Sequence, residues 1–314
     1  MTLNQLQLLF PQATPDTWRQ HCNGGGWVQN TAHVDKTAYV GENAVVHDNA
    51  RVTHHAKVLD HARVFGNAWV RDHSEVRDKA EVLGNAILRD QVKVFGKACI
   101  DGDAELCGNA WTYGDALVSG GAIVLDWAQV FGKATLFGTP KVSDQSMVYG
   151  DACVHGNARL ADHAEVCGNA SVYDYAKVFG EAKVSGEACV YGNASVYEMS
   201  SVYGKASVLD NATVFGSARI CGNAMIFDNA RVFGNAKVRG LATVYEYARV
   251  SGRARVFGGA SVSGHSAIFD DAKVYDNAKV FRDARVSSNE RVHGNAIVFG
   301  DLKDRHEIEQ LYWL

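Results

Sequence analysis

The side chains in this sequence best suited to acid–base or metal chemistry are histidines. His55 and His73 stand eighteen residues apart, with His54 beside the first and His61 nearby. A neutral imidazole can accept a proton or bind a transition metal. A metal site needs further ligands, and the sequence offers no third one at a suitable spacing. We therefore expect no metal, and we interpret His55 and His73, the weak metal candidates, as residues that fill a corner of the fold.

His155 is the one candidate for a catalytic base, and a weak one; it lies on a face of the predicted fold, described below, that lacks charged residues and where subunits could meet. The sequence contains no phosphate-binding loop, zinc-knuckle spacing or nucleophile elbow. The seven cysteines are odd in number, and their spacing matches neither zinc ligands nor a secreted disulfide framework. We therefore expect reduced thiols and no dedicated catalytic residue.

A repeat of six residues positions all these side chains. From Val28 to Val298 every sixth residue is Val, Ile or Leu, except Thr112, and the residue two places earlier is mostly Ala. Residues two apart face the same way on an extended strand, so Ala and Val share the inner face. The Gly or Asp that follows tolerates positive φ and favours a turn. Each hexad is therefore predicted to form one short strand and one corner.

Three sides of six residues return the chain to its starting direction, so residues eighteen apart should stack. This predicts an all-β fold: a single-stranded parallel β-helix of triangular cross-section over residues 27–300, with about 18 residues per coil and roughly 15 coils. Ala beside Val suits a narrow interior.

Short caps are predicted at both ends of the solenoid. Residues 1–26 should form an N-terminal cap with a short helix from Thr14-Pro15-Asp16 to Arg19. Residues 301–314 have helical spacing and should form a C-terminal capping helix. The apolar residues expected to cover the first coil are Leu3, Leu6, Leu8, Leu9, Phe10 and Trp18.

The three predicted faces differ in charge. On the faces built around Val34 and Val40, the outward residue before each Val is often charged, as on a solvated wall. On the face built around Val28 this residue is uncharged in ten successive rungs. The set is Cys99, Leu117, Thr135, Cys153, Ser171, Cys189, Ser207, Met225, Thr243 and Ser261. The residues after the Val add Phe137, His155, Tyr173, Tyr191, Leu209, Phe227 and Tyr245.

Together these residues form what we call the uncharged strip, which covers on the order of 500 Å², near the upper limit of what monomers expose. We predict that it is an interface with another subunit or a protein partner. The alternative is a bland wall whose rings fold over the corner. The residues expected to carry the interface are Leu117, Phe137, Cys153, Tyr173, Tyr191, Met225, Phe227 and Tyr245.

Aromatic and basic residues form further columns. Rings eighteen residues apart, such as Phe95 and Tyr113 or Phe179 and Tyr197, should stack on each other, the alternative being a planar ligand such as a carbohydrate. Lys237, Arg255, Lys273 and Arg291 should lie across rings or pair with corner aspartates. A nucleic-acid track is the less favoured interpretation of this column.

Composition sets limits on partners and location. The net charge of −4 gives no global basic field, so we expect no nucleic-acid partner. The N-terminus lacks the basic start and apolar run of a signal peptide, and no stretch is long and apolar enough to cross a bilayer. We therefore expect a cytoplasmic protein without a membrane partner.

The repeat resembles that of the bacterial hexapeptide-repeat family, as in Val64-Phe65-Gly66-Asn67-Ala68-Trp69-Val70. The opening Gly25-Gly26-Trp27-Val28 and the Gly-Asn-Ala style are similar to the uncharacterised YdcK-like branch, which is labelled acetyltransferase-like. This resemblance implies a left-handed winding. One departure is that the Gly found directly after the aliphatic residue in that family here mostly comes one place later. The family's enzymes typically trimerise and hold an acyl donor between subunits, with a His as base.

We predict a non-enzymatic structural or interaction β-solenoid that associates with itself or a protein partner through the uncharged strip, without a cofactor. The sequence shows no loop extruded from a coil, which such enzymes often use to shelter their substrates. The alternative function is an acyltransferase-like enzyme with a site between subunits, acyl-coenzyme A as substrate and His155 as base.

Overall fold

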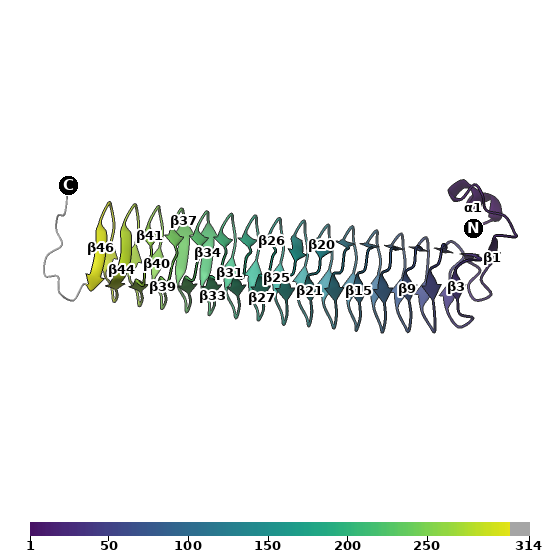
Figure 1. The fold of residues 1–314 in the computed structure, drawn as a ribbon, viewed down its shortest axis with the longest axis horizontal. Coiled ribbons are helices and arrows are strands. Elements are labelled where there is room, and N and C mark those ends of the chain that lie inside the picture. The colour runs from purple at the N-terminus through teal and green to yellow at the C-terminus, as the bar shows by residue number, and fades with distance from the viewer. Residues whose placement is uncertain (302–314) are drawn as a thin grey trace. The chain divides into compact units, whose positions relative to one another are not determined.

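The computed structural model describes residues 1–301, and the chain divides into two compact units, Met1–Gly156 and Asn157–Leu314. In each unit the chain winds in successive coils of short strands (Figure 1). The predicted C-terminal helix lies outside the described residues, apart from Asp301 at the end of a strand. Within residues 1–301, no helix is long and apolar enough to span a bilayer.

The first unit contains one helix, α1 (Leu3–Leu9), and the first 23 strands, beginning with β1 (Trp18–Gln20). Its strands on the Val28 face are β2 (Trp27–Gln29), β5 (Val45–Val46), β8 (Arg63–Val64), β11 (Glu81–Val82), β14 (Cys99–Ile100), β17 (Leu117–Val118), β20 (Thr135–Gly138) and β23 (Cys153–Gly156). Those on the Val34 face are β3 (His33–Val34), β6 (Arg51–Val52), β9 (Trp69–Val70), β12 (Ile87–Leu88), β15 (Glu105–Leu106), β18 (Ile123–Val124) and β21 (Lys141–Val142). Those on the Val40 face are β4 (Tyr39–Val40), β7 (Lys57–Val58), β10 (Glu75–Val76), β13 (Lys93–Val94), β16 (Trp111–Thr112), β19 (Gln129–Val130) and β22 (Met147–Val148).

The second unit repeats the same order of faces. On the Val28 face lie β26 (Ser171–Val172), β29 (Cys189–Val190), β32 (Ser207–Val208), β35 (Met225–Ile226), β38 (Thr243–Val244), β41 (Ser261–Val262), β44 (Lys279–Val286) and β46 (Ile297–Asp301). On the Val34 face lie β24 (Arg159–Leu160), β27 (Lys177–Val178), β30 (Ser195–Val196), β33 (Thr213–Val214), β36 (Arg231–Val232), β39 (Arg249–Val250) and β42 (Ala267–Ile268); β44 continues onto it. On the Val40 face lie β25 (Glu165–Val166), β28 (Lys183–Val184), β31 (Ser201–Val202), β34 (Arg219–Gly222), β37 (Lys237–Gly240), β40 (Arg255–Val256), β43 (Lys273–Val274) and β45 (Arg291–Val292).

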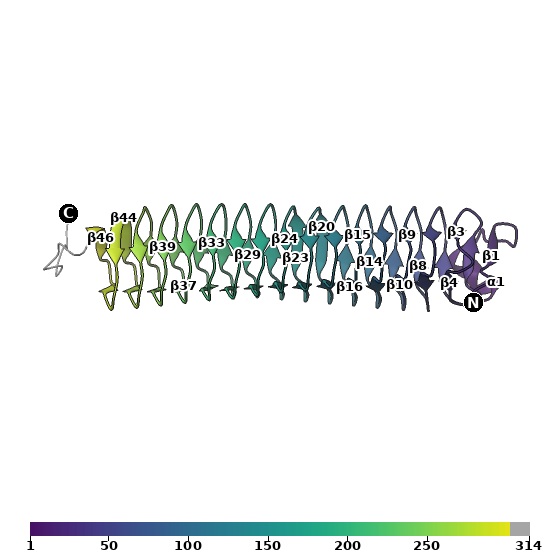
Figure 2. The ribbon, with the colours of Figure 1, turned by 90° about the horizontal axis from the view of Figure 1, so that it is seen from below.

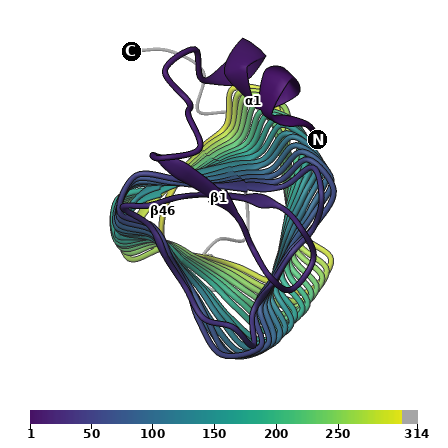
Figure 3. The same ribbon diagram turned by 90° about the vertical axis from the view of Figure 1, so that its right-hand side faces the viewer.

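Strand pairing follows the predicted coil of eighteen residues. In the first unit β4 pairs in parallel with β7, with Val40 opposite Val58; in the second, β29 pairs with β32, with Val190 opposite Val208. Strands of successive coils lie side by side (Figure 2), and the view along the coils shows three sides (Figure 3). The Val40 face has 15 strands within the described residues, so the prediction of roughly 15 coils is confirmed.

The interior consists of the two predicted columns of small and aliphatic side chains. Pairs such as Ala62 and Val64, or Ala206 and Val208, have no exposed surface. The free energy gained on burial is roughly proportional to the apolar area removed from water. Burial of these two columns is therefore the main contribution to the stability of each coil. Five polar residues within these columns are also fully buried: Ser74, Thr112, Ser146, Ser200 and Ser266.

The corners use the turn chemistry that the sequence predicts. From Val46 onward, the residue two places after each core aliphatic residue has positive φ, as in Gly66 (φ 70°) and Asp90 (φ 65°). At many corners with Asp, the carboxylate also accepts a hydrogen bond from a backbone amide in the next coil; Asp90 Oδ2 lies 2.9 Å from Gly108 N. Asp tolerates this left-handed conformation better than most residues, and the added bond explains why it can replace Gly here.

The N-terminal cap differs from its prediction. The helix is α1, which begins after Thr2, because the Thr2 side chain and the Gln5 side chain form a reciprocal capping box. Thr14 does not start a helix: the amides of Thr17 and Trp18 donate to its carbonyl in a single turn, and β1 follows.

The cap covers the strand edge of the first coil. β1 pairs antiparallel with β2, so the amides and carbonyls at the start of the Val28 face have partners. Leu6 and Trp18 are buried against the coil as predicted, whereas Leu8 and Leu9 are exposed, so the prediction for those two residues was wrong. Figure 3 shows α1 outside the three-sided coils.

Candidate functional site

In the first unit, the uncharged strip runs over four neighbouring strands. Cys99, Leu117, Thr135 and Cys153 lie opposite one another in the parallel register of β14, β17, β20 and β23. Leu117 and Phe137 are 36% and 42% exposed. The strip is therefore an outward surface and is not folded into the interior.

In the second unit the strip continues over six strands, β26, β29, β32, β35, β38 and β41, again in register. The Tyr173 and Tyr191 rings stack with centroids 4.8 Å apart and 4° between their planes. Phe227 and Tyr245 stack in the same way, at 4.8 Å and 2°. Met225 beside them is 40% exposed. In the second unit the strip thus contains two stacked ring pairs and an exposed methionine beside one of them.

Burial raises the pKa of several thiols and tyrosine hydroxyls of the strip. Burial raises the pKa of the Cys153 and Cys189 thiols. It also raises the pKa of the Tyr173 hydroxyl to about 12, with Tyr191 as the next cause. A thiol must ionise to act as a nucleophile, so these cysteines are poorly suited to covalent catalysis at neutral pH.

His155 lies on the strip as predicted, but its ring is engaged in the stack. Its imidazole lies face to face on the Phe137 ring, with centroids 4.5 Å apart and 6° between the planes. The surface hollow that borders the strip in the second unit has a volume of about 380 Å³ and is lined by Tyr245, Ser261 and Phe281, among others. The residues that line this hollow include no histidine.

His55 and His73 also stack, with ring centroids 5.4 Å apart and 10° between the planes. Within the described residues there is no group of three or more His, Cys, Asp or Glu side chains that could hold a metal ion. The neighbouring His54 lies 3.3 Å from Asp72, from Nδ1 to Oδ1. The structure thus gives the pair a stacking role at a corner.

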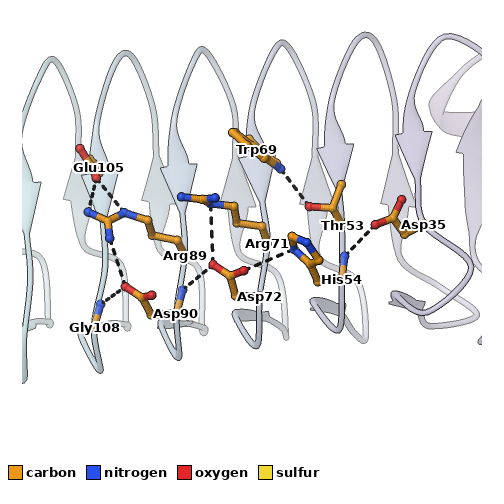
Figure 4. A network of polar contacts seen from close by, with 10 residues as sticks. All are labelled: Asp35, Thr53, His54, Trp69, Arg71, Asp72, Arg89, Asp90, Glu105 and Gly108. Atoms are coloured by element: carbon orange, nitrogen blue, oxygen red, sulfur yellow. Dashed lines mark hydrogen bonds and ion pairs between the residues drawn. The ribbon is translucent and has the colours of Figure 1, made fainter.

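A chain of polar contacts surrounds this corner in the first unit (Figure 4). The His54 amide donates to Asp35 Oδ2 at 2.8 Å, and this bond is the largest cause that lowers the pKa of Asp35. Further along, Arg89 donates to Glu105 at 2.7 Å and lies 3.4 Å from Asp90. Each charge has an opposite charge or an amide beside it, so the network stabilises successive coils and leaves no free charge for a ligand.

The aromatic columns on the other two faces stack as predicted. Phe95 and Tyr113 have ring centroids 4.8 Å apart, and Phe179 and Tyr197 have centroids 4.9 Å apart, with planes within 2° of parallel. Because each inner ring is covered on both faces by its neighbours, these rings offer only their edges to a planar ligand.

The basic residues of the second unit do not behave as predicted. Arg219, Lys237, Arg255, Lys273 and Arg291 lie opposite one another in β34, β37, β40, β43 and β45, and we call them the basic column. None of the five forms an ion pair or cation–π contact with another described residue. The prediction that they cover rings or pair with aspartates was therefore wrong. Neighbouring arginines take those roles: Arg239 lies over Phe257 and Arg253 pairs with Asp271.

Sequence reasoning named four members of the basic column and missed Arg219. The signal was available, because Arg219 stands eighteen residues before Lys237 and the register of β34 and β37 places them opposite each other.

A comparison with protein families agrees with the repeat architecture. A family model described as "YdcK Beta solenoid repeat" matches residues 218–232 and 248–264. No curated protein matches the chain significantly. Together with the coils described above, the match places this chain among β-solenoid repeat proteins.

Proposed function

We propose that this protein is a non-enzymatic structural β-solenoid that associates with further copies of itself through the uncharged strip. The observation that carries this proposal is the exposure of apolar side chains on the uncharged strip of each unit: Leu117 and Phe137 in the first and Met225 in the second. Contiguous exposed apolar surface on a soluble protein marks an interaction site, because burying it removes apolar area from water.

The regular spacing of the strip favours a second copy as the partner. Within a ring pair such as Tyr173 and Tyr191 the centroids are 4.8 Å apart, which is the spacing of neighbouring strands in the β-ladder. A second copy presents the same spacing, so its ring edges and apolar side chains meet those of the first in register in a self-complementary contact. Such isologous contacts are the commonest way in which identical chains associate.

The area of the strip limits the strength of this contact. Six rungs at about 4.8 Å and a width of about 10 Å give roughly 290 Å² per copy in the second unit. Stable interfaces bury about 800 Å² per partner. We therefore expect a weak association, with a dissociation constant of about 1 μM or weaker.

The chemistry of the strip supports binding more than catalysis. Its thiols and its Tyr173 hydroxyl are protonated at neutral pH because burial raises their pKa values. Neutral groups cost less to bury in an interface than charged ones, which suits them to a contact surface.

The resemblance to the hexapeptide-repeat family suggests a second candidate, an acyltransferase-like enzyme that binds acyl-coenzyme A between subunits. The position of His155 on the strip favours it, because a subunit contact would surround this imidazole. Calorimetric titration with coenzyme A separates the candidates. The scaffold predicts no binding up to about 1 mM, whereas binding that is lost in His155→Ala would establish the enzyme.

Sedimentation velocity over about 1–200 μM protein tests the association. We expect the wild-type mass to rise with concentration and Tyr191→Arg to remain at the mass of one chain, because an arginine on the strip would bury a charge. Tyr197→Arg is the matched control, since Tyr197 also follows a core Val and lies in a ring stack, but on the Val34 face. A mass for Tyr191→Arg that equals the wild-type value at every concentration would exclude the strip as the interface.

A further inference from the structure

The basic column is a line of like charges at a constant spacing. The parallel register places Arg219 opposite Lys237, Lys237 opposite Arg255, and so on through Lys273 to Arg291, one cation in each of five successive coils. Lys273 is half-buried and the other four are exposed. Like charges directly opposite one another on a sheet are destabilising, so the column needs an explanation.

Elsewhere on the same face the signs alternate. In the first unit Lys57 lies opposite Glu75, which lies opposite Lys93. In the second unit Lys183 lies 2.6 Å from Glu165 in the neighbouring coil. The fold thus pairs opposite charges along this face in the earlier coils. The basic column departs from that pattern, as expected where an anion from outside the chain supplies the opposite charge.

We propose that the basic column binds the phosphate backbone of a double-stranded nucleic acid. The cations form a single straight file, which fits a linear polyanion better than the two-dimensional surface of a membrane. Release of counterions from a nucleic acid drives such binding locally, even when the whole protein carries a net charge of −4.

The rings beside the column favour a duplex over a single strand. Phe257, Tyr275 and His293 already stack on one another, with centroids 4.9 and 5.1 Å apart. Proteins that hold single strands stack the bases on open aromatic faces. Here each ring is covered on at least one face by the next ring of the stack, so few faces remain for bases. A duplex keeps its bases inside and presents its phosphates outward, so it does not need such faces.

A surface hollow of about 500 Å³ lies along the column and adds neutral donors. Besides Arg219, Lys237 and Arg255, its lining includes the ion pair of Arg253 and Asp271. It also includes Ser217 and Asn235, whose hydroxyl and amide groups can donate to phosphate oxygens. Contacts of these kinds fix a backbone in place but do not distinguish bases. We therefore expect binding that is independent of base sequence.

Fluorescence anisotropy of a labelled DNA duplex of about 20 base pairs, titrated with the full chain at about 50–200 mM KCl, tests the proposal. The logarithm of the binding constant should fall with the logarithm of salt concentration, with a slope of up to about −4.5 for five neutralised phosphates. The double variant Lys237→Gln/Lys273→Gln should reduce that slope by about 1.8 and weaken binding at low salt at least tenfold.

The matched control is Lys183→Gln/Lys205→Gln, which removes the same charge from lysines that pair with Glu165 and Glu187. It should leave the binding constant and its slope unchanged. Equal losses in both double variants would overturn the assignment to the column. So would tighter binding of a single strand with the same number of phosphates, or binding of a heparin fragment without binding of the duplex.

Discussion

Replacing Ser74 by alanine should strengthen the coil that contains it, although the substitution removes a hydroxyl group. Ser74 is fully buried in the column of small residues, and its Oγ has no hydrogen-bond partner among the described residues. Ser146 occupies the same column and is equally buried, but its Oγ donates to the Ser143 carbonyl at 2.6 Å. The same substitution at the two positions therefore isolates the effect of the missing bond.

The expected changes have opposite signs. A buried polar group without a partner costs about 1–3 kcal/mol. Ala56 and Val92 occupy the equivalent position in the two neighbouring coils, so an apolar side chain fits there. After a small loss for the void left by the oxygen, Ser74→Ala should raise the free energy of local opening by about 1 kcal/mol. Ser146→Ala removes a formed bond and should lower that free energy by about 1 kcal/mol.

Native-state hydrogen exchange measures this difference coil by coil, which suits a repeat protein in which unfolding need not be a single transition. The Lys57 amide donates to the Ser74 carbonyl at 2.9 Å, and the Gln129 amide donates to the Ser146 carbonyl at 3.0 Å. Exchange at Lys57 should slow about fivefold in Ser74→Ala, and exchange at Gln129 should speed up about fivefold in Ser146→Ala. Faster exchange in both variants would mean that the Ser74 hydroxyl donates to the Arg71 carbonyl in solution, and the reasoning would fail.

Three further predictions concern the interior, the cap and the junction between them. Thr112→Val should raise the midpoint of thermal unfolding, because the buried Thr112 hydroxyl also has no partner among the described residues; an unchanged or lower midpoint would contradict this. Burial lowers the pKa of His47 below its ordinary value of 6.5, so the folded state favours the neutral ring; its contribution to stability is present above pH 6.5 and is lost as pH falls below that value. The His47 ring stacks on Phe65, and its centroid lies 6.2 Å from that of the Trp18 ring. Tryptophan fluorescence measured from pH 8 to 5 should therefore report loosening of the cap, and His47→Gln should abolish this pH dependence. Gly26→Ala should destabilise the cap by about 1–3 kcal/mol, because a Cβ there would collide with the Gly41 carbonyl; equal protection from hydrogen exchange in Gly26→Ala and wild type would refute it.

The solenoid could be predicted from the sequence because every coil obeys the same local rule. Ala62 and Val64 alternate with outward residues, and Gly66 supplies the positive φ that the corner needs. Repetition removes the usual uncertainty about which strands pair, since a fixed period makes residues eighteen apart neighbours. Left-handed winding rests on the family resemblance and stays a prediction.

The helix of the N-terminal cap was placed wrongly because two helix starts compete near the N-terminus. Thr14-Pro15 is a good local signal, but Thr2 and Gln5 complete a capping box, and β1 gains a ladder with the edge of β2. Such pairing depends on where the first coil ends in space, which local signals do not encode. The pairing of β1 with the first coil therefore decided between a helix after Thr2 and a helix after Thr14.

The candidate sites were predictable as columns but not as contacts. Spacing placed Tyr173 on Tyr191 and Lys237 opposite Arg255. Spacing could not show that Arg239 would lie over the Phe257 ring and that Arg253 would pair with Asp271, in place of the residues of the basic column. That choice depends on side-chain reach across corners, and it leaves the basic column without partners among the described residues.

The mass of the wild-type protein in solution, measured by sedimentation from about 1 to 200 μM, tests the central claim most directly. A structural solenoid that self-associates through the uncharged strip predicts a mass that rises above that of one chain as concentration increases. A mass of one chain across the whole range would contradict it.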